Sequence, residues 1–148
     1  MAVIREAEFR SDLERYMKTR VRAYAKAAAD AGQTLAAYAL MSFYASYSPT
    51  MYQRTGNLLN SFKRYYRDNG TRVYGGVRIT TEGMSDYTTG TWSTSQVASA
   101  TWLGGQHGNY ITTPPYTILV ANFIALSPTF DAKAIQEAHA QGYAVLKF

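Results

Sequence analysis

Two histidines are the side chains of this sequence best suited to acid–base or metal chemistry. His107 and His139 lie far apart in the chain, and a metal site would need at least one more ligand group near either of them. The acids around both are sparse and the chain has no cysteine, which excludes thiolate ligands, disulfides and a cysteine nucleophile. We therefore expect His107 to be a turn residue among glycines and His139 to face solvent on a helix.

The other patterns that accompany catalysis are missing from the sequence. No serine occupies a Gly-x-Ser-x-Gly turn. The glycine pairs Gly75-Gly76 and Gly104-Gly105 are not followed by the Lys-Ser/Thr of a phosphate-binding loop. Four of the ten acids fall within the first fourteen residues, on the exposed face of an expected helix. The sequence thus predicts no enzyme, no bound metal and no cofactor.

A cluster of basic residues is the strongest chemical feature that remains. Between Tyr52 and Ile79 one acid, Asp68, stands against six basic residues: Arg54, Lys63, Arg64, Arg67, Arg72 and Arg78. Such a cluster suits contact with nucleic acid or with an acidic protein surface. A solvated basic face has the same composition. Both interpretations stay open at this stage.

Composition predicts one soluble domain. The 148 residues are 47% hydrophobic and 17% charged, which is enough to build one core. Thirteen tyrosines indicate either a tyrosine-rich core edge or surfaces that a protein partner covers. The charged first residues do not resemble a signal peptide. The uncharged run 31–53 is too polar to span a membrane and 118–126 is too short.

The basic cluster must be positioned by a long helix and a hairpin. Apolar residues recur every three or four positions from Arg5 to Ser46, which predicts a helix with one apolar stripe. Gly32 either lies within this helix or ends a first one. The part after Gly32 is apolar nearly all round, so it should be buried on most sides, and Pro49 ends it. Two strands, 58–67 and 71–80, flank the turn signal Asp68-Asn69-Gly70, with one face of the second strand core-like and the other basic and aromatic.

The last third of the chain is expected to consist of short helices and strands joined by loops. Residues 81–95 are expected to form a surface loop and 96–103 a short helix or strand. The segment 116–126 should form a helix after Pro114-Pro115, or else a buried strand, and Ser127-Pro128 should break it. A helix over 131–141, a stop at Gly142 and a final strand over 143–148 follow. The predicted fold class is α+β: a single domain, 1–148, with a helical segment (1–46), a corner and hairpin (47–80), a loop (81–95) and C-terminal α/β elements (96–148).

The corner between helix and hairpin resembles a signature of head–tail joining proteins of long-tailed bacteriophages, also called tail-completion, neck or minor capsid proteins. The residues that fill the pattern Tyr-x-Pro-x-x-Tyr-x-Arg-Thr-x-x-Leu are Tyr47, Pro49, Tyr52, Arg54, Thr55 and Leu58. A second segment, from Trp102 to Gly108 and followed by Pro114-Pro115, is similar to a Gly-x-His-Gly and Pro-Pro segment of these proteins. The physical interpretation of the corner is structural: Pro49 stops the helix, and Arg54 can donate to the carbonyls left free at its end.

The resemblance implies a structural virion protein at the head–tail connector. The chain would form a homo-oligomeric ring of six or twelve subunits between a portal or adaptor protein and the tail tube, with DNA passing through the channel. Assembly would take place in the host cytoplasm, without a membrane. The residues expected at interfaces are Lys63, Arg64, Tyr65, Tyr66, Arg67, Gly105, His107 and Gly108. The alternative is a nucleic-acid-binding protein that uses the same basic, aromatic hairpin.

Overall fold

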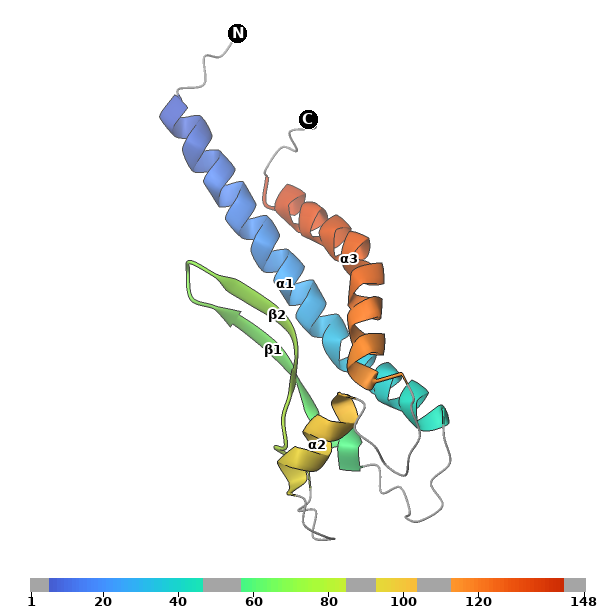
Figure 1. Cartoon of the computed structure of the whole chain (residues 1–148). Coiled ribbons are helices and arrows are strands. Elements are labelled where there is room, and N and C mark those ends of the chain that lie inside the picture. Colours follow the sequence, from blue (N-terminus) through green and yellow to red (C-terminus); the bar gives the residue numbers. More distant parts are fainter. Residues whose placement is uncertain (1–5, 47–56, 85–92, 104–112, 143–148) are drawn as a thin grey trace.

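A computed structural model describes residues 6–46, 57–84, 93–103 and 113–142 of the chain. The elements are α1 (Glu6–Ala45), a 3-10 helix η1 (Asn57–Asn60), β1 (Phe62–Asp68), β2 (Val73–Ile79), α2 (Thr94–Trp102) and α3 (Pro115–Ala140). The long helix α1 is the axis of the molecule, with the hairpin along one side and α3 along another (Figure 1). The predicted α+β class is confirmed.

Helix α1 is continuous across Gly32, so the glycine does not end a first helix. A Cβ atom at Gly32 would lie 3.0 Å from the carbonyl carbon and oxygen of Gly76. The missing side chain therefore lets strand β2 approach the helix closely. Glycine costs a helix roughly 1 kcal/mol relative to alanine, and the packing of the hairpin offsets this cost.

The predicted hairpin is confirmed, and its strands pair antiparallel from Phe62↔Ile79 to Asp68↔Val73. In the turn, the Asn69 side-chain oxygen accepts the backbone N–H groups of Thr71 and Arg72 at 3.2 and 2.7 Å. Gly70 adopts φ 86°, a left-handed conformation that glycine takes without steric cost. The first strand starts later than predicted, because residues 57–60 form the 3-10 helix instead.

Strand β2 packs on α1 through backbone as well as side chains. A Cβ atom at Gly75 would lie 1.8 Å from the carbonyl oxygen of Ala25, so this glycine contacts the helix backbone directly. Val73 and Val77 are half-buried on the predicted core face. Ile79, predicted on the same face, is 36% exposed, because it lies at the end of the strand.

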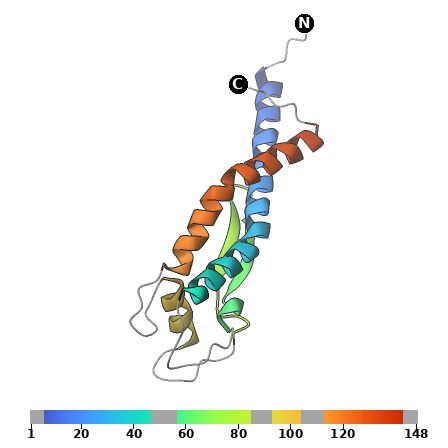
Figure 2. The ribbon, with the colours of Figure 1, turned by 90° about the vertical axis from the view of Figure 1, so that its right-hand side faces the viewer.

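Helix α3 corrects the prediction for the C-terminal third. The expected break at Ser127-Pro128 is wrong, since α3 runs without interruption from Pro115 to Ala140 with Pro128 inside it. A proline in a helix removes one hydrogen bond and bends the axis, and α3 is visibly bent near its middle (Figures 1 and 2). Contacts with α1 hold the two parts in one helix. Gly142, at φ 85°, follows its end as predicted, and its N–H donates to the His139 carbonyl at 2.9 Å.

The core lies where α1, β1, α2 and α3 meet. It includes Leu35, Leu40, Phe62, Trp102 and Leu119. Of the two alternatives for 96–103, the helix is correct: α2 starts after Ser93, whose side chain and that of Gln96 form a capping box. The Trp102 indole N–H donates to the Ser61 hydroxyl at 2.8 Å, and both residues are fully buried.

The end of α1 is less buried than its sequence predicts. Leu40 and Phe43 are buried, whereas Tyr38 and Met41 are 57% and 56% exposed. The end of α1 is therefore apolar on all sides but buries only one side against the core. The predicted final strand over 143–148 lies outside the described residues.

Candidate protein-interaction surface

The basic residues of the hairpin are largely paired with acids. The Lys63 ammonium lies 2.7 Å from Glu82, and the Arg78 guanidinium lies 3.6 Å from the same carboxylate. The Arg64 Nε donates to Asp30 of α1 at 2.7 Å. The hydrogen bond and charge of Lys63, with the charge of Arg78, lower the pKa of Glu82. Three of the five basic residues that the structure describes here thus have an acidic partner.

The tip of the hairpin is tied to α1 through Asp68. Its carboxylate accepts the Gly70 backbone N–H at 2.8 Å and the Arg22 Nε at 2.6 Å. These two hydrogen bonds lower the pKa of Asp68. The single acid of the basic cluster therefore fixes the turn and fastens it to the helix.

Arg67 and Arg72 are the basic hairpin residues left without an ion pair in the described part of the chain. Both are exposed. Tyr65 and Tyr66 are half-buried, and the Arg64 guanidinium lies 5.9 Å from the centre of the Tyr66 ring. The five predicted interface residues from Lys63 to Arg67 follow one another on β1, so their side chains alternate between the two faces of the hairpin. The ion pairs make this strand less positive than the sequence suggests.

Most residues of the predicted corner motif lie outside the described residues. These are Tyr47, Pro49, Tyr52, Arg54 and Thr55, together with the predicted interface residues Gly105, His107 and Gly108. Leu58 is described: it is half-buried and packs against the core. His139 faces solvent on α3, as predicted.

The outward side of α3 forms a surface without charge. Residues 113–130 contain no acidic or basic side chain. Exposed residues at helical spacing form the face that we call the α3 outer face: Thr117, Ala121, Ile124, Ala125 and Pro128. Ile124 is 69% exposed. Helices that face water usually carry charges on the solvent side, so this face has the composition of a contact surface.

By length and composition alone, α3 is also the one helix in the described ranges that is apolar enough to cross a membrane. Core helices of soluble proteins can have the same length and composition. In the most apolar stretch of α3, 17% of the residues are buried. The apolar character of α3 is thus displayed on the surface to a large extent.

The first half of α1 carries a second exposed apolar surface. Phe9, Leu13, Met17 and Val21 follow one another at steps of four residues and are 39%, 38%, 47% and 46% exposed. We call this set the α1 stripe. The first turns of α1 extend beyond both the hairpin and α3 in two perpendicular views (Figures 1 and 2), so no described segment covers them.

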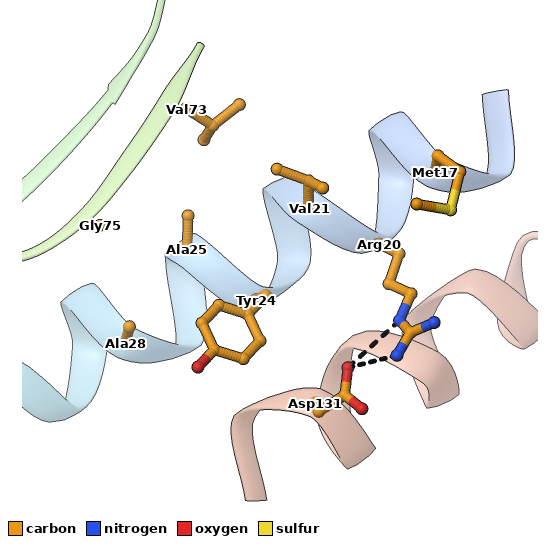
Figure 3. Close-up of a pocket in the computed structure, with 9 residues that line it drawn as sticks. All are labelled: Met17, Arg20, Val21, Tyr24, Ala25, Ala28, Val73, Gly75 and Asp131. Carbon is orange, nitrogen blue, oxygen red and sulfur yellow. Dashed lines mark hydrogen bonds and ion pairs between the residues drawn. The ribbon is translucent and has the colours of Figure 1, made fainter. Parts of the chain in front are cut away.

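The α1 stripe leads into a pocket between α1, β2 and α3 (Figure 3). The pocket holds about 300 Å³ and its wall is mainly apolar, with Met17, Val21, Tyr24 and Val73 among the lining residues. At one side the Arg20 guanidinium donates twice to Asp131 of α3, at 3.2 and 2.6 Å. This ion pair raises the pKa of Arg20 and closes one wall of the pocket.

The α1 stripe and the pocket beside it consist mainly of apolar side chains. No group of three or more metal-ligating side chains occurs within the described ranges. The sequence contains the signal for the stripe, because the spacing of Phe9, Leu13 and Met17 is visible in it. The periodicity predicted a face packed on the core, however, and only the structure shows that no described segment covers the first turns of α1.

Comparison with known proteins gives one match. The sequence model of the YomN family matches residues 10–142, which span every described helix and strand except the first turn of α1. No curated protein and no solved structure matches the chain. The family is phage-derived. The chain therefore belongs to the YomN family, a phage-derived protein family.

Proposed function

We propose that this chain is a structural virion protein of a tailed phage: a ring-forming subunit at the head–tail connector that joins head to tail around the DNA channel. The α3 outer face carries the proposal. This helical face, with Ile124 69% exposed, lacks the charged residues that a solvent-facing helix usually carries. It suits a chain that spends its working life packed against other subunits.

A ring requires two different surfaces on each subunit, so that one subunit's first surface meets its neighbour's second. The α3 outer face and the hairpin lie on different sides of α1 (Figure 1). We propose that the α3 outer face and the strands of the hairpin provide this pair of surfaces in a ring of six or twelve, and that the hairpin tip, near which Arg67 and Arg72 lie, stays outside the subunit contact. The portal or adaptor and the tail tube would then contact the two ends of the ring.

The partly neutralised positive charge of the hairpin suits a subunit of a channel through which DNA must move. Lys63, Arg64 and Arg78 are already paired with acids, which reduces their attraction to phosphates. Arg67 and Arg72 have no ion-pair partner among the described residues, so their guanidinium groups can bind an acidic surface of a neighbouring protein. We propose that they dock on another virion protein, and that an R67E/R72E variant fails to join the connector. Arg64 is a poor probe, because its reversal would also break the ion pair with Asp30.

The proposal is tested by deleting the gene from the phage that encodes it. We expect DNA-filled heads and complete tails that remain separate, and joining should be restored when purified protein is added to the lysate. Mass spectrometry of intact particles should detect the chain in wild-type virions. The proposal would be refuted if the deletion phage produced normal virions. It would also be refuted if wild-type virions did not contain the chain.

The alternative, nucleic-acid binding, draws support from Arg67 and Arg72, which have no ion pair in the described part of the chain, and from Tyr65 and Tyr66 on the same hairpin. It predicts that the purified protein binds DNA tightly at low salt and releases it at high salt. The R67E/R72E variant should then lose this affinity, whereas the connector proposal predicts weak affinity in the wild-type protein too.

A further inference from the structure

The α1 stripe and the pocket beside it remain unassigned by the connector proposal. The stripe consists of Phe9, Leu13, Met17 and Val21, each more than a third exposed. Steps of four residues form a ridge that runs slightly around the helix. A second copy can pack against this ridge at the shallow crossing angle of about 20°, at which two helices stay in contact over several turns. The stripe is therefore suited to a helix of its own kind.

The charges on the same part of α1 are segregated along its length. Residues 6–14 carry four acids and one arginine, whereas residues 15–26 carry five basic residues and no acid. Two parallel copies would place like charges side by side. Two antiparallel copies place the acidic half of each beside the basic half of the other, which favours that orientation.

The ion pairs already present within the helix do not prevent this. Glu6–Arg10, Asp12–Arg15 and Glu14–Lys18 are formed between side chains that are at least half exposed. Exposed pairs of this kind are weak and exchange partners readily. Arg20 and Arg22 are held by Asp131 and Asp68, so Arg15, Lys18 and Lys26 are the basic residues of this segment available to a second helix.

The pocket provides space where an antiparallel partner would bring a large side chain. With Leu13 of one copy opposite Met17 of the other, Phe9 comes opposite Val21, at the edge of the pocket (Figure 3). The pocket volume of about 300 Å³ exceeds the roughly 150 Å³ of a protein cavity known to hold benzene. A phenyl ring from a second copy therefore fits between α1 and β2.

We propose that two copies of this chain pair through antiparallel α1 stripes, each seating Phe9 at the pocket of the other. The contact is reciprocal and related by a two-fold axis. It concerns the free protein and does not rest on the connector proposal. A failed pairing would leave the gene-deletion test untouched, and a failed gene-deletion test would leave the pairing intact.

The first test is the solution mass over a range of concentrations, measured by light scattering. The wild-type protein should reach about twice the 16.5 kDa of one chain. Leu13→Glu should remain at the mass of one chain at concentrations at least tenfold higher. Ser11→Glu is the matched control: it adds the same charge about 200° around the helix, on the opposite face, and should pair like the wild type.

The orientation is tested by disulfide trapping, which is clean because the chain has no cysteine. A mixture of Phe9→Cys and Val21→Cys proteins should form covalent dimers on oxidation. Phe9→Cys alone should not, because the two positions 9 of an antiparallel pair are about 18 Å apart along the helices. The proposal is overturned by a wild-type protein that stays monomeric, by a Leu13→Glu variant of unchanged mass, or by rapid dimerisation of Phe9→Cys alone.

Discussion

Apolar residues recur every three or four positions in both halves of α1, but they are mostly buried in the second half and exposed in the first. In the second half the residues turned to the hairpin and α3 are mostly small: Ala25, Ala28, Ala29, Gly32, Ala36 and Ala39, all buried. In the first half the stripe residues Phe9, Leu13, Met17 and Val21 are large and exposed. Small side chains allow a strand to approach the helix backbone, as Gly75 does at Ala25.

The small residues let strand β2 lie close to the helix backbone, while the large residues Leu35 and Leu40 of the same half fill the core with Phe62. The second half of α1 is thus a folding interface. No described segment covers the first turns of α1, so their apolar residues are available for association. The following variants separate these two roles.

The largest contrast is expected from one substitution made in both halves. Leu40→Ala removes a side chain that is fully buried in the core, and it should lower the free energy of unfolding by about 3 kcal/mol. Leu13→Ala, in the exposed stripe, should cost less than about 1 kcal/mol in dilute protein. Urea unfolding measures both. Similar losses would mean that the first half of α1 is part of the core.

Gly75→Ala tests the close approach of β2. Its new Cβ would clash with the Ala25 carbonyl oxygen at 1.8 Å, so we expect a loss of about 2 kcal/mol or more. Gly83→Ala is the control, because nothing lies within 4 Å of its Cβ and only the backbone at φ +86° is strained. That strain costs roughly 1 kcal/mol. A smaller effect at Gly75 than at Gly83 would contradict the packing argument.

Ser61→Ala should cost about 1.5 kcal/mol, because it leaves the buried Trp102 N–H without its acceptor. The same substitution in a Trp102→Phe background should cost much less, since no donor remains to be satisfied. The double-mutant cycle is measured by urea unfolding. Additive losses would show that the hydrogen bond contributes little.

The smallest effect is expected from acidification at the hairpin tip. The pKa of Asp68 in the folded chain lies below its ordinary value of 3.8. Its contribution to stability is therefore complete above about pH 4 and is lost as the pH falls through the lower, folded pKa. Asp68→Asn keeps an acceptor for the Gly70 N–H and removes the charge. The urea midpoint of this variant should fall less between pH 4 and pH 2 than that of the wild type.

Much of the fold could be predicted because its signals are local. Asn69-Gly70 between two strand-like segments is a strong local signal for a hairpin turn, Pro114-Pro115 suits the start of a helix, and Gly142 suits its end. The position of Lys63 to Arg67 on one strand followed from the turn. Their ion pairs did not, because the partner acid Asp30 is 34 positions from Arg64. The net charge of the predicted site was accordingly too high.

The α+β class, the long helix, the hairpin and the absence of cysteine chemistry follow from the amino-acid sequence, because composition and short-range periodicity suffice for these. Tertiary contacts were needed to place Gly32 within α1, to let Pro128 bend α3 without ending it, and to pair Arg20 with Asp131, 111 positions away. They also decide which half of the apolar stripe is covered. Each of these depends on contacts between distant segments, whose free energy outweighs a local preference of about 1–3 kcal/mol.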